Sequence, residues 1–121
     1  MVLAVEPLVQ RSLARLLPDA RFASANYVGA FWTRDNQAQI DLIGTEKDTA
    51  NGRIEFAGSI KWRERKPFDT SDARELRTLA EQVPGWQSTT KLVGVSRTDF
   101  KTEVELDVAL TPQDLLDAWR T

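Results

Sequence analysis

The sequence predicts an α/β protein with a central mixed β-sheet flanked by helices, in the order α-β-β-β-α-β-β-α. Three observations lead to this prediction. Apolar residues recur at three- and four-residue steps near the N-terminus, β-rich runs follow between residues 26 and 62, and a helix, two short strands and a final helix come after them. The 121 residues are enough for one domain, and 41% apolar with 28% charged residues is a typical globular composition. We therefore expect residues 1–121 to form a single domain.

The first predicted element is a helix over residues 5–17. Pro7 is tolerated in its first turn, and Pro18 marks its end. Its apolar stripe consists of Val5, Leu8, Val9, Leu13, Leu16 and Leu17. This spacing is typical of an amphipathic helix that packs one face on a sheet.

Two strands and two connections are expected after this helix. Residues 26–34 are β-rich, and 34-RDN-36 is a turn signal. Residues 38–43 alternate as a second strand, and residues 44–52, which close with Asn51-Gly52, form a hairpin-like connection. Alternation in the second strand places Ile40 and Leu42 on one face, and Gln39, Asp41 and Ile43 on the other.

The third strand, residues 53–62, is the longest one predicted. Alternation assigns Ile54, Phe56, Ile60 and Trp62 to one face, and Glu55, Ala57, Ser59, Lys61 and Arg63 to the other. A helix over 69–83 is expected next, with Thr70 or Ser71 as its N-cap and Pro84-Gly85 as its stop.

The chain is then predicted to end in two short strands and a helix. The strands cover residues 91–95 and 104–110. Pro112 opens the final helix, which holds Leu115, Leu116 and Trp119.

The composition excludes several kinds of chemistry. There is no cysteine and no histidine, which excludes disulfides, Cys–His zinc sites, thiol nucleophiles and imidazole bases. The net charge is −2, but residues 1–67 carry ten Lys/Arg against eight Asp/Glu, so a local basic patch can form. No secretory signal pattern and no long apolar segment is found, so we expect a cytoplasmic protein without a membrane span.

The strongest candidate site combines Asp41 with Ser59 and Lys61. If the strands that carry them are neighbours, all three side chains can point to the same side of the sheet. A carboxylate beside an ammonium on a packed sheet suits Mg²⁺-assisted phosphodiester chemistry, with the lysine positioning water and offsetting charge. The alternative is a cross-strand salt bridge that faces solvent.

Two further candidates lie on either side of this strand pair. Glu6 shares a helical stripe with Val9 and could supply a second metal ligand, or it is an ordinary acidic residue in the first turn of a helix. The segment 61-KWRERKP-67 could bind nucleic acid through its cations, with Trp62 as a stacking surface or as part of the core. Its cations are Lys61, Arg63, Arg65 and Lys66. The chain has no glycine-rich phosphate loop, and we expect no ATP site in it.

Several segments together resemble a known family. The runs 28-VGAFWTRDNQAQIDLIG-44 and 58-GSIKW-62 are similar to the G-x-W-x-R … E-I-D-L … G-E-x-K-W pattern of the PD-(D/E)XK nuclease-like domain. That domain is found at the C-terminus of archaeal and bacterial AAA+-type ATPases, and GSIKW resembles its actinobacterial branch. The segments 5-VEPLVQRSLARLLPD-19 and 112-PQDLLDAW-119 also look like this domain.

The resemblance implies a restriction-endonuclease-like fold, excised from a longer chain whose ATPase domain would be a partner. It implies that Asp41 binds Mg²⁺ or Mn²⁺, that Lys61 is the motif lysine, and that Glu6 is the first-helix glutamate. Ser59 stands where the motif has an acid, and Gln39 stands where EIDL has its glutamate. A hydroxyl is a weaker Mg²⁺ ligand than a carboxylate, so a weak metal site is expected.

No nearby glutamate is expected to replace the missing acid. Glu55 is about 13 Å from Ser59 along a strand, at ~3.3 Å per residue, and Glu64 has the wrong parity. The expected function is therefore nucleic-acid binding with weak or absent cleavage. The alternative is a catalytically inactive fold used for protein interaction, and the short edge strand at 104–110 could support a homodimer.

Overall fold

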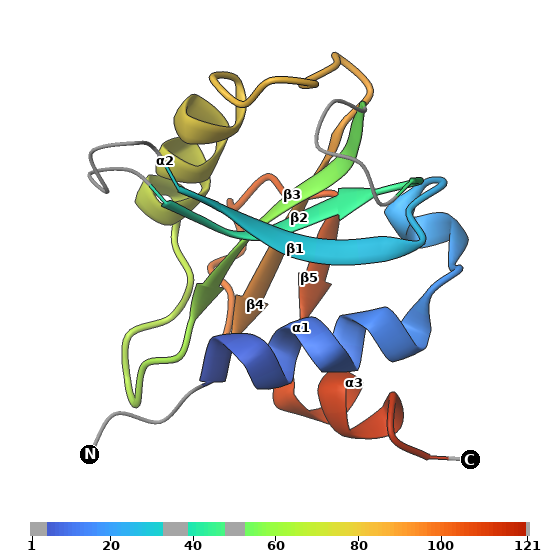
Figure 1. The fold of residues 1–121 in the computed structure, drawn as a ribbon. Helices are drawn as coiled ribbons and strands as arrows, with labels where there is room; N and C mark the ends of the chain where they lie inside the picture. Colours follow the sequence, from blue (N-terminus) through green and yellow to red (C-terminus); the bar gives the residue numbers. More distant parts are fainter. Residues whose placement is uncertain (1–4, 33–38, 48–52, 121) are drawn as a thin grey trace.

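The computed structural model describes residues 5–32, 39–47 and 53–120, apart from the side chains of Glu6 and Trp32. Figure 1 shows its helices and strands. In chain order they are α1 (Val5–Leu16), a 3₁₀ turn (Ala20–Phe22), β1 (Tyr27–Trp32), β2 (Gln39–Thr45), β3 (Ile54–Lys61), α2 (Thr70–Ala80), β4 (Lys91–Ser96), β5 (Val108–Leu110) and α3 (Pro112–Asp117). The turn predicted at 34–36 and the dipeptide Asn51-Gly52 lie outside the described residues.

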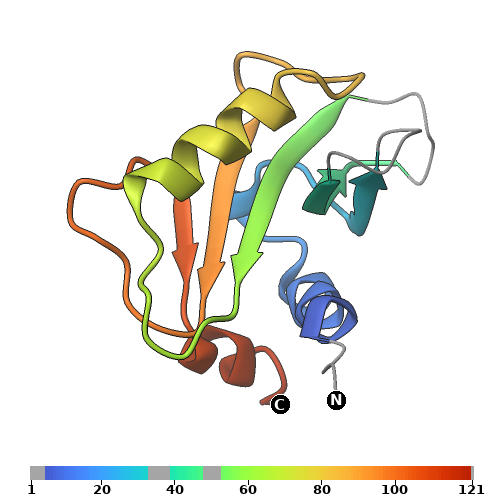
Figure 2. The ribbon, with the colours of Figure 1, turned by 90° about the vertical axis from the view of Figure 1, so that its left-hand side faces the viewer.

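The five strands form one mixed sheet in the order β1-β2-β3-β4-β5. Strand β2 runs antiparallel to both β1 and β3, whereas β3, β4 and β5 are parallel to one another. The parallel part is visible in Figure 2, where α2 connects β3 to β4. The predicted α/β class, with a mixed sheet flanked by helices, is confirmed.

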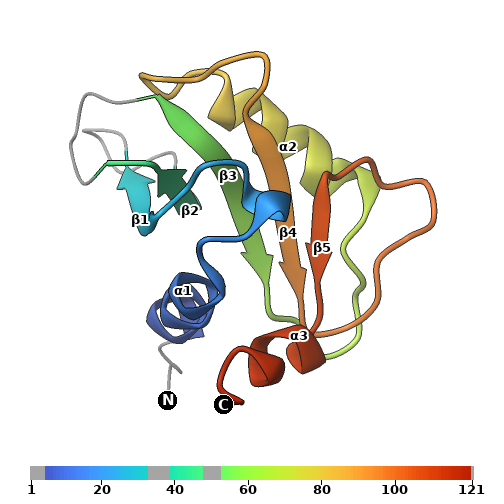
Figure 3. The same cartoon turned by 90° about the vertical axis from the view of Figure 1, so that its right-hand side faces the viewer.

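The helices cover the two faces of the sheet, and each face has its own apolar core. Figure 3 shows α1 and α3 on one side of the sheet and α2 on the other. The first core contains Val9, Leu13, Leu42, Phe56, Val93, Leu110 and Leu115. The second contains Ile40, Ile43, Ile54, Ala57, Leu76 and Leu92. Burial on both faces explains why β4 reads as an almost continuous apolar run.

Two irregularities in strand pairing change the predicted faces of β2 and β3. Phe31 pairs with Ile40 and Gly29 pairs with Ile43, so β2 has one extra residue at Asp41–Leu42. Ile40 consequently packs in the second core while Leu42 packs in the first, and the prediction that they share a face is wrong.

Strand β3 has a similar irregularity near its start. Gly44 pairs with Phe56 and Thr45 pairs with Ile54, which leaves Glu55 as the extra residue. Ile54 therefore lies in the second core, on the opposite face from Phe56, and their predicted common face is also wrong. Strict alternation fails at both places because an inserted residue reverses the side-chain parity.

Several element ends also differ from the prediction: β2 continues to Thr45, where a connection was expected from residue 44, and α2 ends at Ala80. The N-cap of α2 is Asp69, because its carboxylate accepts a hydrogen bond from the Asp72 N–H at 2.9 Å and the Asp72 carboxylate accepts one from the Asp69 N–H. Strand β5 covers three residues, not 104–110. The pairing ends at Asp107, whose backbone N–H donates to the Leu92 carbonyl and whose carboxylate accepts a hydrogen bond from the Leu92 N–H.

Candidate functional site

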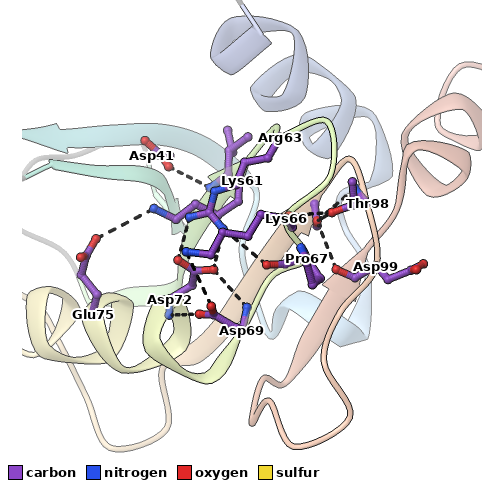
Figure 4. A network of polar contacts seen from close by, with 12 residues as sticks. Asp41, Lys61, Arg63, Lys66, Pro67, Asp69, Asp72, Glu75, Thr98 and Asp99 are labelled. Atoms are coloured by element: carbon purple, nitrogen blue, oxygen red, sulfur yellow. Dashed lines mark hydrogen bonds and ion pairs between the residues drawn. The ribbon is translucent and has the colours of Figure 1, made fainter.

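The site begins where β2 and β3 separate. Their regular pairing ends at Leu42 and Gly58. One residue further, Asp41 Oδ2 accepts a hydrogen bond from the Ile60 N–H at 2.8 Å (Figure 4). The carboxylate therefore takes the place of a strand partner for β3. The bulge in β2 explains this orientation, since a bulged residue is aimed differently from its neighbours.

Two glutamines hold Asp41 in position. Gln39 Nε2 donates to Asp41 Oδ1 at 3.2 Å, and Gln10 Nε2 from α1 donates to the Asp41 carbonyl at 3.1 Å. Gln39, which stands where the resemblance expects a glutamate, therefore supports the aspartate from within the same strand.

The separation of the strands opens a cavity of about 450 Å³ on the α2 side. Its polar lining consists of Gln39, Asp41, Ser59, Lys61 and Glu75, and Leu76 and Leu79 lie beside them. The structure thus brings together the three residues Asp41, Ser59 and Lys61. Ser59 is buried, with 9% of its surface exposed, and the Lys61 side chain is half-buried.

Among the described residues of this lining, Glu75 is the acidic residue that the sequence did not identify. It lies on α2, and its Oε1 is 3.9 Å from Lys61 Nζ (Figure 4). The sequence feature that could have indicated Glu75 is its position next to Leu76, an apolar residue that packs α2 on the sheet. Helix position alone does not reveal which strand residue a helix crosses.

Arg63 is held outside the cavity by an ion pair. Its Nη1 and Nη2 donate to Asp72 Oδ2 and Oδ1 at 2.9 and 2.8 Å. The hydrogen bonds to Asp72 raise the pKa of Arg63. Burial alone would raise the pKa of Asp72, but the bonds from Arg63 and from the Asp69 N–H outweigh it and lower this pKa to about 2. Arg63 thus ties the end of β3 to the first turn of α2.

The other cations of the predicted basic segment remain accessible. Arg65 and Lys66 are exposed, and Lys66 Nζ is 3.7 Å from Asp69 Oδ2, in an exposed pair that contributes little. Trp62 is half-buried against the α1 and α3 core. It therefore belongs to the apolar side of the sheet.

Glu55 and Glu64, the other carboxylates considered from the sequence whose side chains are described, do not line the cavity. Glu6 lies in the first turn of α1, and its side chain is outside the described part of the structure. Glu55 Oε1 accepts a hydrogen bond from the Ser24 N–H, and its Oε2 pairs with Arg53 at 2.9 Å. Glu64 is exposed on the loop after β3. In the described residues, no group of three or more Asp and Glu side chains is close enough to hold a metal ion.

A second cavity, of about 650 Å³ and almost entirely apolar, lies between α1 and α3. Leu8, Leu116 and Trp119 line it and are substantially exposed. Trp119 is fixed there because its Nε1 donates to Ser12 Oγ at 2.9 Å and the Arg15 guanidinium stacks 4.2 Å from its ring centre. We call this feature the α1–α3 groove.

No family model, curated protein or solved structure matches this chain. Within the described ranges, no helix has the length and apolar character needed to cross a membrane.

Proposed function

We propose that this chain is a restriction-endonuclease-like domain that binds nucleic acid at the Asp41–Ser59–Lys61 cavity, with weak or absent phosphodiester cleavage. The observation that carries the proposal is the meeting of these three residues, from neighbouring strands, in one polar cavity. The mixed sheet flanked by helices also supports it. In the family that the sequence resembles, an ATPase domain precedes this domain on the same chain, and we propose such a domain as its partner.

The residues of the cavity suit the handling of a phosphate group. The Lys61 ammonium can offset phosphate charge, because it is half-buried and its ion pair within the described residues is a long one, to an exposed glutamate. Arg65 and Lys66 follow within five residues and extend the positive charge away from the cavity.

The donors also fit Mg²⁺ or Mn²⁺, which bind oxygen ligands and are commonly held by one or two carboxylates plus water. Asp41 would hold such an ion, and Ser59 would be a weak neutral ligand. When bound, the ion would supply charge stabilisation at the phosphate. The serine in place of the motif acid is the reason to propose weak or absent cleavage.

The proposal predicts that Lys61→Ala and Arg65→Glu/Lys66→Glu each weaken nucleic-acid binding at least tenfold. Both changes remove phosphate contacts, so the loss is expected for every sequence tested, with a reduced dependence of affinity on salt. Fluorescence anisotropy with labelled single-stranded and duplex DNA and RNA, in Mg²⁺ and at two salt concentrations, measures it.

The matched control is Arg11→Glu/Arg120→Glu. It changes the net charge as much as the Arg65 and Lys66 double variant does, but on exposed positions of the α1 and α3 side. Its affinity should fall much less. Equal losses in both double variants would show a general charge effect and would contradict a site at the cavity.

A second candidate function, a module for protein interaction, is favoured by the α1–α3 groove. Soluble domains rarely gather several exposed large apolar side chains at one place without a binding role. The isolated chain can test one occupant, a second copy of itself. Under this candidate, Leu8→Asp/Leu116→Asp abolishes concentration-dependent self-association in sedimentation equilibrium and leaves nucleic-acid affinity within twofold. If the wild-type chain is monomeric at every concentration tested, a second copy of the chain is excluded as the occupant of the groove.

A further inference from the structure

The charge of the cavity is unfavourable for a phosphate by itself. Among the described residues of its lining, Asp41 and Glu75 carry negative charges and Lys61 carries a positive one. The formal balance is −1, which repels a phosphodiester. One divalent cation would turn the balance of these described residues to +1, which favours a phosphodiester.

Ser59 gives an independent indication that something binds here. The residue is 9% exposed, and it lines the cavity. Within the described part of the chain, its hydroxyl has no hydrogen-bond partner, and because no fully buried side-chain oxygen there lacks one, the Ser59 oxygen must be accessible from the cavity. An unpartnered hydroxyl that opens on a polar cavity is able to bind a cation or the water that a cation carries.

The contact between Glu75 and Lys61 does not by itself account for the position of Glu75. The two charged atoms are 3.9 Å apart, and the Glu75 side chain is 68% exposed. Exposed pairs of this kind contribute little to stability. The Glu75 carboxylate is therefore able to turn toward a cation in the cavity at small cost.

From these observations we infer that Glu75 of α2 is the second carboxylate of a divalent-cation site, together with Asp41 and the Ser59 hydroxyl. It supplies, from a helix, the negative charge that Ser59 no longer supplies from the strand. The inference rests on the proposed function and assigns a residue to its metal site. Oxygen ligands select a hard cation of the Mg²⁺ or Mn²⁺ class.

The test is calorimetric titration of Mn²⁺ into the wild-type chain and into Glu75→Gln, Asp41→Asn and Lys61→Met. We expect Glu75→Gln to weaken Mn²⁺ binding at least tenfold and Asp41→Asn to abolish it, because ligand charge sets the affinity for hard cations. Lys61→Met should strengthen binding severalfold, because it removes a positive charge beside the ion.

The matched control is Glu81→Gln, the same change at the end of the same helix, where the glutamate pairs with Arg77 and does not line the cavity. Its Mn²⁺ affinity should equal that of the wild type. The Lys61→Met/Glu75→Gln double variant removes any indirect effect through the ion pair. A tenfold loss relative to Lys61→Met supports direct ligation, and no loss overturns it.

Nucleic-acid binding in EDTA and in Mn²⁺ separates this inference from the proposed function. If Mn²⁺ strengthens nucleic-acid binding by the wild type but not by Glu75→Gln, the result supports both the inference and the proposed function. If Glu75→Gln binds Mn²⁺ like the wild type while Asp41→Asn does not, Glu75 is not a ligand and the proposed function stands. If the wild type binds neither Mn²⁺ nor nucleic acid, both are overturned.

Discussion

Replacing Asp72 by asparagine is expected to lower the free energy of unfolding by about 2–3 kcal/mol. The change keeps the shape of the side chain but removes the charge that faces Arg63 through two hydrogen bonds. The Asp72 side chain is 9% exposed and the Arg63 side chain 28%, so water can replace the lost partner of Arg63 only in part. The α2 capping box weakens at the same time, since Asp72 is its N3 residue. Urea denaturation at neutral pH measures the loss.

The control for this prediction is Asp117→Asn, which breaks an exposed pair with Arg120 and should cost less than about 0.5 kcal/mol. The pH dependence gives an independent check. Because the folded pKa of Asp72 is lowered to about 2, its contribution is complete above pH 3.8 and is lost as the pH falls toward 2. The wild type should lose more stability in this window than Asp72→Asn does. Parallel curves for the two proteins would contradict a strong Arg63–Asp72 pair.

Gly44→Ala is expected to destabilise the fold by about 2–3 kcal/mol through overpacking. A Cβ at Gly44 would lie 2.7 Å from Phe56 Cζ, with two other ring atoms nearer still. The ring has no space to move, because Phe56 is completely buried and packs against Phe22 with ring centres 5.4 Å apart. Thermal or urea unfolding of the variant measures the cost. The close approach of the Phe56 ring thus requires glycine on β2.

Gly29→Ala is the matched control, since it adds the same methyl group to β1, where nothing lies within 4 Å of the new Cβ. Its stability should equal the wild type or exceed it by up to about 1 kcal/mol. The double variant Gly44→Ala/Phe56→Leu should recover at least about 1 kcal/mol relative to the sum of the single changes, because leucine frees the contested space. Additive effects would show that the cost at Gly44 does not come from the ring.

Both predictions depend on contacts that local sequence patterns do not contain. The sequence determined the helical periodicity over residues 5–17, the β-rich runs of β1 to β3 and the proline that opens α3. These are local properties, because they follow from apolar spacing, proline positions and side chains that bond their own backbone. These local patterns were enough to predict the mixed α/β class and to predict that Asp41, Ser59 and Lys61 are neighbours.

The tertiary structure decided where these side chains point. Alternation placed Ile40 with Leu42 and Ile54 with Phe56, but the inserted residues in β2 and β3 put each pair on opposite faces. A bulge is a compromise between the registers of two strands, and no single strand encodes it. The same irregularity aims Asp41 at the Ile60 N–H and opens the cavity.

The tertiary structure also decided how the charges are distributed. Arg63 and Lys66 are near neighbours in the sequence, yet Arg63 is held by Asp72 and Lys66 is exposed. Glu75 entered the cavity for the same reason, because α2 crosses the sheet next to Lys61. The sequence by itself thus determined the elements and the types of chemistry available. Only the packing of α2 on β3 decided which charges face the cavity, because that contact joins residues that are distant along the chain.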